Sequence, residues 1–241
     1  MFPDDIFRSG SFRGPWQTWA RNGATDFWMP GFHPFRLSYN PKPDLYISGQ
    51  AHQGSIWEPL ETAVILSLLP SGSVFYDLGA ALGWYTIIAA LKVGKAGRVV
   101  ACEPESENCR LLRQNIKQNE LTNVSAIKCA VSDRTGWGRL YCSKENLGDH
   151  RLNVKLDGRS SQWTRTAVLL DLIADGYPAP DLLKIDTQGC EAQILSCLPE
   201  LCRLNPELNV RNFGRSGSRN VGAHIRPCSR PLRLKTLIFS C

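Results

Sequence analysis

The chain has 241 residues, 43% of them hydrophobic and 21% charged, which is close to the composition of ordinary globular proteins. It is long enough for one substantial α/β domain with an extension and a sizeable core. The formal net charge is +6, but residues 203–241 alone carry eight Lys and Arg against one Glu, a net of +7. The remaining residues hold 20 bases and 21 acids, so the basic balance belongs to the C-terminal tail alone.

Residues 1–54 are rich in Trp, Phe, Pro and Gly and show little periodicity. Disordered segments usually contain few aromatic residues. Here the aromatic residues include Trp16, Trp19, Phe27, Trp28, Phe32 and Phe35. We therefore treat residues 1–54 as an N-terminal extension and expect it to fold over the main domain as a lid or a side wall.

Cysteine usage and apolar stretches bear on the compartment. Nine cysteines occur without a C-x-x-C pair. Cys102, Cys129 and Cys190 lie in or beside apolar runs, which favours core packing over a metal site or disulfide bonds. The first residues lack the basic and apolar regions of a signal peptide, and the apolar stretches at 63–69 and 84–91 are too short to span a bilayer. We expect a reduced, cytoplasmic location, no membrane contact and no metal.

Residues 74–103 predict one βαβ unit. An apolar run leads into Asp77 and a glycine-rich turn, an apolar helical pattern follows at residues 84–91, and a second apolar run ends in Glu103. The length of about 30 residues is what such a unit needs. Parallel strands require a crossover of this kind, and it is right-handed in nearly all cases.

The turn of this unit has the residue types of a nucleoside site. Gly79 and Gly83 lack a Cβ atom, so the chain can double back and its backbone can approach a ligand closely. Ala80 keeps that approach open. Glu103 follows Gly79 by 24 residues, and a carboxylate at about this distance, at the end of the second strand, is placed to accept both hydroxyls of a ribose. The pattern therefore predicts that a nucleoside binds here.

Residues that the turn lacks narrow the choice of nucleoside. A pyrophosphate cradle needs G-x-G-x-x-G, and here the middle glycine is missing; G-x-x-x-x-G-K-[ST] is absent from the chain. Asp77, directly before the turn, suits a positively charged ligand better than a phosphate. S-adenosyl-L-methionine carries an ammonium and a sulfonium group and no phosphate. The D-x-G-x-x-x-G turn followed by Glu103 resembles the cofactor site of class I S-adenosylmethionine-dependent methyltransferases, and a chance Asp-x-Gly in an ordinary βαβ unit is the weaker alternative.

Further strands and helices are predicted on both sides of this unit. Apolar residues at helical spacing predict a helix over residues 55–69, and residues 105–119 predict another helix with Ser106 as its N-cap. Residues 124–131 predict the third strand of the sheet. Residues 136–156 predict an inserted strand or hairpin with loops, and we expect the histidine in it, His150, to be solvated.

A second strand–turn–helix pattern, at residues 181–195, stands where the fourth strand of a doubly wound sheet is expected. Lys184 interrupts this apolar strand and is expensive to bury unpaired, so we expect it to pair with a carboxylate such as Glu191. Asp186 ends the strand and is the first candidate for a general base. Its alternatives are to hold the methionine ammonium group of the cofactor or to cap the following helix.

Taken together, these segments resemble the FkbM family of methyltransferases. The matching stretches are residues 57–62, 77–86 and 103–104, Asn115 with Asn119, and residues 130–133 and 184–191. Their order and spacing agree with the family from about residue 55 to 200. The resemblance implies an α/β fold with a Rossmann-like, doubly wound, mostly parallel sheet over residues 55–210. It also implies methyl transfer from S-adenosyl-L-methionine, typically to a hydroxyl on a sugar, polyketide or similar metabolite.

The C-terminal segment departs from the family. After Val210 the family would continue with its last strands, whereas residues 211–241 are Arg-rich and interrupted by Pro. This abrupt shift in composition resembles a change of reading frame near residue 210, and a natural divergent tail is the alternative. We expect the last strands to be missing or altered, which would leave an exposed sheet edge and reduce stability and activity.

The resemblance and the residues together define three hypotheses. The favoured one is an O-methyltransferase acting on a small molecule or a glycan, with Asp186 as the catalytic residue. Its cofactor-binding residues are Asp77, Gly79, Ala80, Gly83, Glu103 and Asp133, the last being either an adenine-binding carboxylate or an ordinary turn residue. The second hypothesis is a cofactor-binding but inactive, truncated relative, and the third is an NAD(P)-dependent oxidoreductase. Glu58 either lines the site or is a solvated helix residue.

Nucleic acid is not expected as a partner. The fourth strand carries no N-P-P-Y-type segment of the kind found in enzymes that methylate amino groups of bases. The residues specify neither the acceptor nor the oligomeric state.

Overall fold

The computed structural model describes residues 17–21, 23–29, 32–40, 46–143, 146–155, 158–197, 199–200, 208–212 and 234–238. Its central sheet contains β4 (Val74–Leu78), β5 (Arg98–Cys102), β6 (Val124–Ile127), β11 (Leu182–Ile185), β12 (Leu208–Asn212) and β13 (Leu234–Ile238). The strand order is β12-β13-β11-β4-β5-β6, and the paired strands are all parallel.

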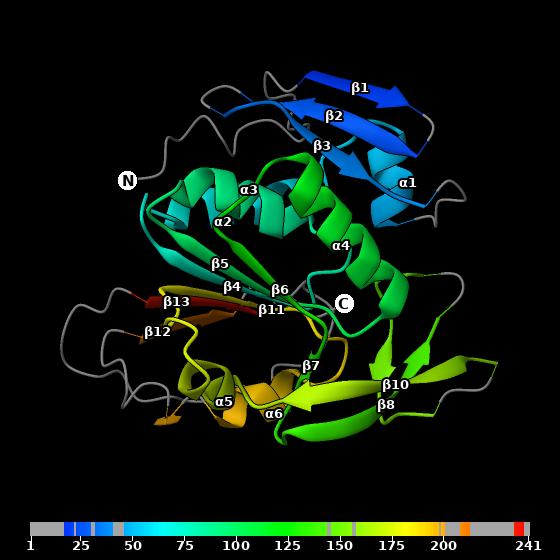
Figure 1. Cartoon of the computed structure of the whole chain (residues 1–241), viewed down its shortest axis with the longest axis vertical. Coiled ribbons are helices and arrows are strands. Elements are labelled where there is room, and N and C mark those ends of the chain that lie inside the picture. The colour runs from blue at the N-terminus through cyan, green and yellow to red at the C-terminus, as the bar shows by residue number, and fades with distance from the viewer. Residues whose placement is uncertain are drawn as a thin grey trace.

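Helices cover both faces of the central sheet (Figure 1). One face carries α2 (Pro59–Leu68), α3 (Trp84–Val93) and α4 (Ser106–Gln118), and the other carries α5 (Leu169–Ala174) and α6 (Glu191–Ser196). Because β4 and β11 are adjacent in the sheet but distant in the chain, the strand order reverses direction beside β4. This is the predicted doubly wound, Rossmann-like arrangement, which places ligand sites at the carboxyl ends of the strands next to the reversal.

The N-terminal segment forms a small layer of its own over α3. It contains α1 (Ile47–His52) and a three-stranded antiparallel sheet of β1 (Gln17–Arg21), β2 (Ala24–Trp28) and β3 (Phe35–Ser38). The rings of Phe27 and Phe35 pack on Trp84 with centroid distances of 5.0 and 5.8 Å. This packing buries α3 between two sheets and agrees with the expectation of a segment folded over the main domain. The boundary at residue 55 stays a prediction.

A third sheet lies beyond the end of β6. It has four strands in the order β7-β10-β8-β9, formed by β7 (Ala130–Val131), β8 (Gly136–Cys142), β9 (Arg151–Leu152) and β10 (Ser160–Ala167). The single strand predicted over residues 124–131 is therefore wrong in its extent. The chain leaves the central sheet after Ile127, and Ala130–Val131 pairs with β10 instead.

The start of α4 also differs from the prediction. Its N-cap is Glu105, whose side chain accepts a hydrogen bond from the Asn108 backbone nitrogen at 2.7 Å. The hydroxyl of Ser106 is engaged elsewhere, because it accepts a hydrogen bond from Lys128 Nζ and donates one to Gln162 Oε1. The predicted cap was therefore one residue too late.

The last two strands complete the described part of the central sheet. The final strand in the chain, β13, lies between β11 and β12, and β12 forms the edge. Two strands thus occupy the place where we expected missing or altered strands, and both run parallel to their neighbours. None of the helices within the described ranges is long and apolar enough to cross a membrane.

Candidate active site

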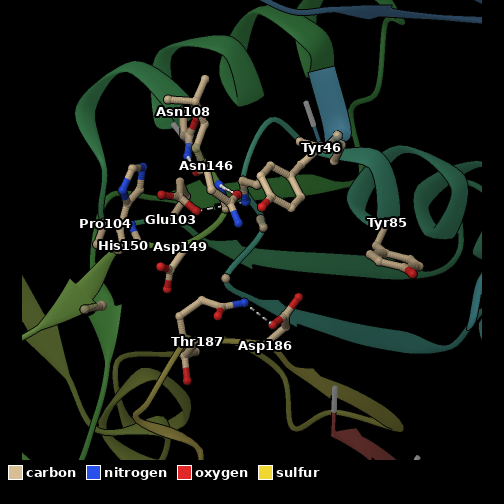
Figure 2. Close-up of a pocket in the computed structure, with 18 of the residues that line it drawn as sticks. Tyr46, Tyr85, Glu103, Pro104, Asn108, Asn146, Asp149, His150, Asp186 and Thr187 are labelled. Carbon is tan, nitrogen blue, oxygen red and sulfur yellow. Dashed lines mark hydrogen bonds between the residues drawn. The ribbon is translucent and has the colours of Figure 1, made fainter. Parts of the chain in front are cut away.

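A cavity of about 660 Å³ lies at the carboxyl ends of β4, β5 and β11. This volume is within the range of small-molecule and cofactor sites. Its walls come from the turn after β4, the end of β5, the start of α4, the loop before β9, the turn after β11, and the N-terminal residues Tyr46, Ile47 and Gln50. Figure 2 shows Glu103, Asn108, Asn146 and His150 gathered on one side of the cavity, with Asp186 across from them.

The turn after β4 is held tightly against the end of β11. Gly79 has φ +80°, and a Cβ atom on it would lie 1.9 Å from the backbone oxygen of Asp186. The backbone nitrogens of Gly79 and Ala80 both donate to the Cys102 carbonyl at 3.0 Å. Gly79 and Ala80 line the cavity, as the sequence predicts. Only glycine fits the first of these positions, because a side chain would meet backbone atoms and not a flexible group.

Gly83 has a packing role in this turn. It is the N-cap residue of α3 with φ +99°, and a Cβ atom on it would lie 2.7 Å from a methyl carbon of Leu112 in α4. Gly83 is not among the residues that line the cavity. The glycine therefore allows α4 to approach the start of α3 and supports the turn from behind.

Glu103 projects into the cavity from the end of β5 and is 4% exposed. Its Oε2 accepts a hydrogen bond from the Ala81 nitrogen at 2.8 Å, and its Oε1 accepts one from the Glu105 nitrogen at 2.9 Å. Burial raises the pKa of Glu103 to about 7, although both backbone hydrogen bonds oppose the shift. Glu103, at the end of β5, therefore contacts the glycine turn after β4, as the spacing of these residues in the sequence predicts.

Asp77 lies beneath the turn and does not line the cavity. Its side chain is fully buried and accepts hydrogen bonds from Lys184 Nζ at 2.9 Å and from Thr86 Oγ1 at 2.7 Å. Lys184 Nζ also donates to the Gly79 carbonyl at 3.1 Å. The predicted pairing of Lys184 with a carboxylate is confirmed, but the partner is Asp77. Glu191, the example that we gave, is wrong, since its carboxylate accepts hydrogen bonds from the turn after β11.

Asp186 lines the cavity at the end of β11. Its Oδ2 is 4.0 Å from Lys184 Nζ, and its Oδ1 accepts a hydrogen bond from the side chain of Gln188 at 2.9 Å. Burial raises the pKa of Asp186 to about 6; the charge of Lys184 opposes this shift and the charge of Glu58 adds to it. The alternative in which Asp186 caps the next helix is excluded, because the N-cap residue of α6 is Cys190.

Glu58 and Tyr85 extend this side of the cavity toward the N-terminal segment. The Tyr85 hydroxyl donates to Glu58 Oε2 at 2.7 Å, and the Tyr85 ring lies 5.1 Å from Lys184 Nζ. Glu58 has φ +40°, a left-handed backbone that is uncommon outside glycine. Glu58 was predicted either to line the site or to be a solvated helix residue, and in the structure it lines the cavity.

Asp133 lies outside the cavity, which agrees with the alternative of an ordinary turn residue, whereas His150 differs from the prediction. Asp133 is exposed, and it is not among the residues around the cavity. His150 is buried at 8% exposure and lines the cavity, where its Nδ1 accepts a hydrogen bond from the Ser143 nitrogen at 3.1 Å. The expectation of a solvated histidine is therefore wrong. The neighbouring residue, Asp149, forms ion pairs with Arg151 and Arg159. These ion pairs hold the loop in which His150 forms part of the cavity wall.

The cysteines named from the sequence are buried free thiols, as expected for core residues. In the described part of the chain, no group of three or more His, Cys, Asp or Glu side chains is arranged to hold a metal ion.

The comparison with protein families decides the identity. Residues 77–226 match the family model described as the methyltransferase FkbM domain, which is more than half of the chain. The chain belongs to the FkbM methyltransferase family. The match begins at Asp77, at the glycine turn, and continues beyond Val210, where the composition changes.

Several solved methyltransferase structures are similar to this FkbM family member. One is the FkbM methyltransferase from Methylobacillus flagellatus KT, with 19% identity and a TM-score of 0.38 over 56% of this chain and 31% of the other. Another is the precorrin-6y C5,15-methyltransferase from Geobacter metallireducens GS-15, with 19% identity and a TM-score of 0.37 over 59% and 56%. The chain thus spans less than two thirds of the length of either protein. No curated protein matches it.

Three residues that line the cavity of this FkbM family member, Asn108, Tyr46 and Trp57, were not named as site residues from the sequence. Asn108 is held by its side-chain nitrogen, which donates to the Leu147 carbonyl at 2.8 Å and joins α4 to the loop before β9. Tyr46 and Trp57 approach from the N-terminal side. The sequence signal for Asn108 was its position in the first turn of α4, which begins at Ser106, shortly after Glu103 and the carboxyl end of β5.

Proposed function

We propose that this FkbM family member transfers a methyl group from S-adenosyl-L-methionine to a hydroxyl group of a small molecule or a glycan. The observation that supports this proposal best is the meeting of Gly79, Ala80, Glu103 and Asp186 around one cavity. One half of the cavity has the features of a nucleoside site, and the other half holds a partly buried carboxylate, Asp186, suited to act on an acceptor.

The residues around the turn fit an adenosine. A carboxylate offers about four acceptor positions, and Glu103 uses one on each oxygen for a backbone N–H group. Acceptor capacity therefore remains on both oxygens for the two hydroxyls of a ribose. The small side chains of Ala80 and Ala81 leave the turn open to the ligand. In this proposal Gly79, Ala80 and Glu103 hold the cofactor directly, whereas Asp77 and Gly83 support the turn.

Methyl transfer to a hydroxyl group requires two main contributions from the protein: alignment of the acceptor with the methyl group, and removal of the hydroxyl proton. When bound, the cofactor would supply a methyl group that its sulfonium centre has already activated. Alignment contributes up to about 7–11 kcal/mol in well-oriented reactions, and a positioned base contributes roughly 10²–10⁴-fold. Asp186 takes the base role in our proposal, because its raised pKa of about 6 makes it a stronger base than an ordinary aspartate.

The acceptor would enter between the end of β11 and the N-terminal segment. Tyr46, Trp57 and Tyr85 give this part of the cavity broad aromatic faces, and Glu58 adds a second carboxylate near Asp186. Aromatic faces and carboxylate acceptors together suit a ring that bears hydroxyl groups. The acceptor proposed here is accordingly a sugar or a similarly hydroxylated metabolite.

Calorimetric titration of the full chain tests the cofactor. We expect S-adenosylhomocysteine to bind and NAD to give no heat. Glu103→Ala should weaken binding by about tenfold, because charge-assisted hydrogen bonds to the ribose are lost. Glu107→Ala, on the exposed side of α4, is the matched control and should bind as the native chain does. Binding of NAD alone, or equal affinities for both variants, would contradict the proposal.

Transfer of labelled methyl groups to a panel of glycan and polyketide acceptors tests the reaction. Asp186→Asn should lower the rate by roughly 10²–10⁴-fold while the affinity for S-adenosylhomocysteine stays within about twofold. If Asp186 instead holds the ammonium group of the cofactor, the affinity will fall together with the rate. Binding of the cofactor without transfer to any acceptor would favour the inactive relative.

A further inference from the structure

A regular pattern of tryptophan and arginine side chains covers one face of the hairpin formed by β8 and β10. Trp137 and Arg139 alternate on β8, and Trp163 and Arg165 alternate on β10. The antiparallel register sets Trp163 opposite Arg139 and Arg165 opposite Trp137. Residues two apart point to the same face of a strand, so these four side chains lie on one face. We call the four residues the ribbon face. They form a two-by-two grid in which each indole lies beside a guanidinium group.

The ribbon face is turned to solvent. Trp137 is 70% exposed and Trp163 is 62% exposed, while the side chains on the other face of the hairpin, including Leu140 and Thr164, are buried. The guanidinium carbon of Arg139 lies 5.3 Å from the centre of the Trp163 ring. Exposed indoles on a regular strand lose the burial energy that their size could provide. An exposed aromatic patch of this kind marks an interaction site.

The charged side chains that line a hollow beside the ribbon face are all cations. This hollow of about 410 Å³ is lined by Trp137, Trp163 and Tyr177 together with the cations Arg113, Lys128 and Arg165, and by no acidic residue. Within the described ranges, the ion pairs of the chain do not involve Arg113, Lys128, Arg139 or Arg165. Lys128 and Arg139 each donate a hydrogen bond to a serine hydroxyl, of Ser106 and Ser161. Their remaining N–H groups, and those of Arg113 and Arg165, can bind anionic groups of a partner.

We propose that the ribbon face binds an acidic polysaccharide, with sugar rings lying on Trp137 and Trp163 and carboxylate or sulfate groups on the surrounding cations. The apolar C–H face of a pyranose ring packs flat on an indole, while the ring hydroxyls stay in water. Arg binds planar carboxylates and sulfates through two parallel hydrogen bonds. A polymer that alternates rings and negative charges thus matches a surface that alternates indoles and guanidinium groups.

The choice of a saccharide over a nucleic acid rests on the proposed function, because the acceptor proposed for the cavity is itself a hydroxylated ring. Single-stranded nucleic acid also combines rings and anions, and its binding is one outcome of the test below. The ribbon face and the cavity lie on opposite faces of the same hairpin, since Leu140, on the buried face, lines the cavity. Figure 1 shows β8 and β10 at the end of the molecule away from β1–β3.

The test compares three ligands that separate rings from charge. The full chain is titrated with galacturonate oligosaccharides, with their methyl esters, which keep the rings but lose the charge, and with polyglutamate, which keeps the charge but has no rings. The basic tail attracts any polyanion, so the difference between galacturonate and polyglutamate is the informative quantity. We expect galacturonate to bind at least tenfold more tightly than either control. Only galacturonate offers both sugar rings to the indoles and carboxylates to the guanidinium groups.

Two variants assign the binding to the ribbon face. Trp137→Ala with Trp163→Ala, and Arg139→Gln with Arg165→Gln, should each weaken galacturonate binding by about tenfold or more. Trp19→Ala removes an indole that is 52% exposed on β1 and should leave it unchanged. All variants should keep the native affinity for S-adenosylhomocysteine, which separates this proposal from the proposed function. Absence of galacturonate binding, equal binding of polyglutamate, unchanged binding by both variants, or tighter binding of oligothymidylate would overturn it.

Discussion

Glu103 is a carboxyl group held in a buried position by two backbone N–H groups, at the edge of a cavity large enough for a nucleoside. Burial disfavours its ionised form, so its pKa rises to about 7. Hydrogen bonds from ribose hydroxyls would favour the ionised form. Binding of the cofactor should therefore release a proton from Glu103.

This coupling predicts that cofactor affinity depends on pH. Below pH 7 the free chain must lose a proton before the ribose can bind, so the dissociation constant for S-adenosylhomocysteine should be about tenfold larger at pH 6 than at pH 8. Above pH 7 the affinity should level off. Titration calorimetry at several pH values measures the profile.

Two variants identify the group responsible for this profile. Glu103→Gln cannot ionise and should give a profile without the step near pH 7. Asp186→Asn removes another cavity carboxyl group with a raised pKa and should keep the step. A flat profile in the native chain would show that ribose binding does not depend on the charge of Glu103.

Asp77 and Lys184 show why a residue type alone does not define a role. A carboxylate before a glycine turn suggests a contact with a cationic ligand, yet Asp77 is fully buried against Lys184, a cation of the chain itself. Burial lowers the pKa of Lys184, but Asp77 and Asp186 outweigh this effect and raise it. A buried lysine needs a carboxylate partner. The partner of Lys184 is Asp77, which lies in a neighbouring strand but more than 100 residues away in the chain.

At the scale of single elements, α4 was predicted well along its length and less well at its first residue. Serine is a favoured N-cap and glutamate is not. In the folded chain Ser106 is hydrogen-bonded to Lys128 and Gln162, so Glu105 accepts the hydrogen bond from the Asn108 nitrogen. Contacts with β10 and with the loop after β6 therefore decided which residue caps the helix.

A pair of substitutions tests this assignment. Glu105→Ala should lower the free energy of unfolding by about 1 kcal/mol, because it removes the N-cap and a negative charge beside the positive end of the helix dipole. Ser106→Ala removes only hydrogen bonds at the surface and should cost within about 0.5 kcal/mol. Urea denaturation of both variants measures the difference. A larger loss for Ser106→Ala would mean that the serine caps the helix in solution.

The strand predicted over residues 124–131 illustrates a different failure. Its residues are mostly apolar, with Ser125 and Lys128 as interruptions. The chain changes partner within it: Ile127 pairs with β5, whereas Ala130 pairs with β10. Periodicity reports that residues are extended and half-buried, and it does not report which sheet they join. The change of partner turns Cys129 and Ala130 toward the cavity.

At the scale of the whole molecule, Asn115 joins three parts of the chain. Its side chain, which is fully buried, accepts a hydrogen bond from the Ser38 nitrogen at 2.7 Å. It also donates to the carbonyls of Ser38 and Leu82 at 3.0 and 2.7 Å. One amide thus links the N-terminal sheet, α4 and the glycine turn, and it satisfies backbone groups that water cannot reach.

Removal of this amide should loosen the N-terminal layer. Asn115→Ala leaves three buried backbone groups without their partner and should lower the free energy of unfolding by about 3 kcal/mol. It should also increase hydrogen exchange of the β3 amides. Asn119→Ala removes the hydrogen bonds to Arg36 at an exposed site, where water replaces them, and should cost within about 1 kcal/mol. Equal losses in urea denaturation would show that the Asn115 amide is not a special link.

The features of this protein that could be predicted without a structure are those that depend on residues close together in the chain. The βαβ unit, the turn at Gly79 and the carboxylate at Glu103 follow from spacing within about 30 residues, because strand and helix periods leave a pattern in the chain. The doubly wound order of the sheet and the FkbM family could be predicted from the same segments.

Packing between distant parts of the chain determines which side chains reach the cavity. Asp77, Asp133 and Asp186 each lie near the end of a strand, yet of these three only Asp186 lines the cavity. The carboxylate of Asp77 forms an ion pair with Lys184, and Asp133 is exposed to solvent. Local sequence cannot distinguish these outcomes, because a carboxylate is directed by the residues that pack around it, and here these come from distant strands, α4 and the N-terminal layer.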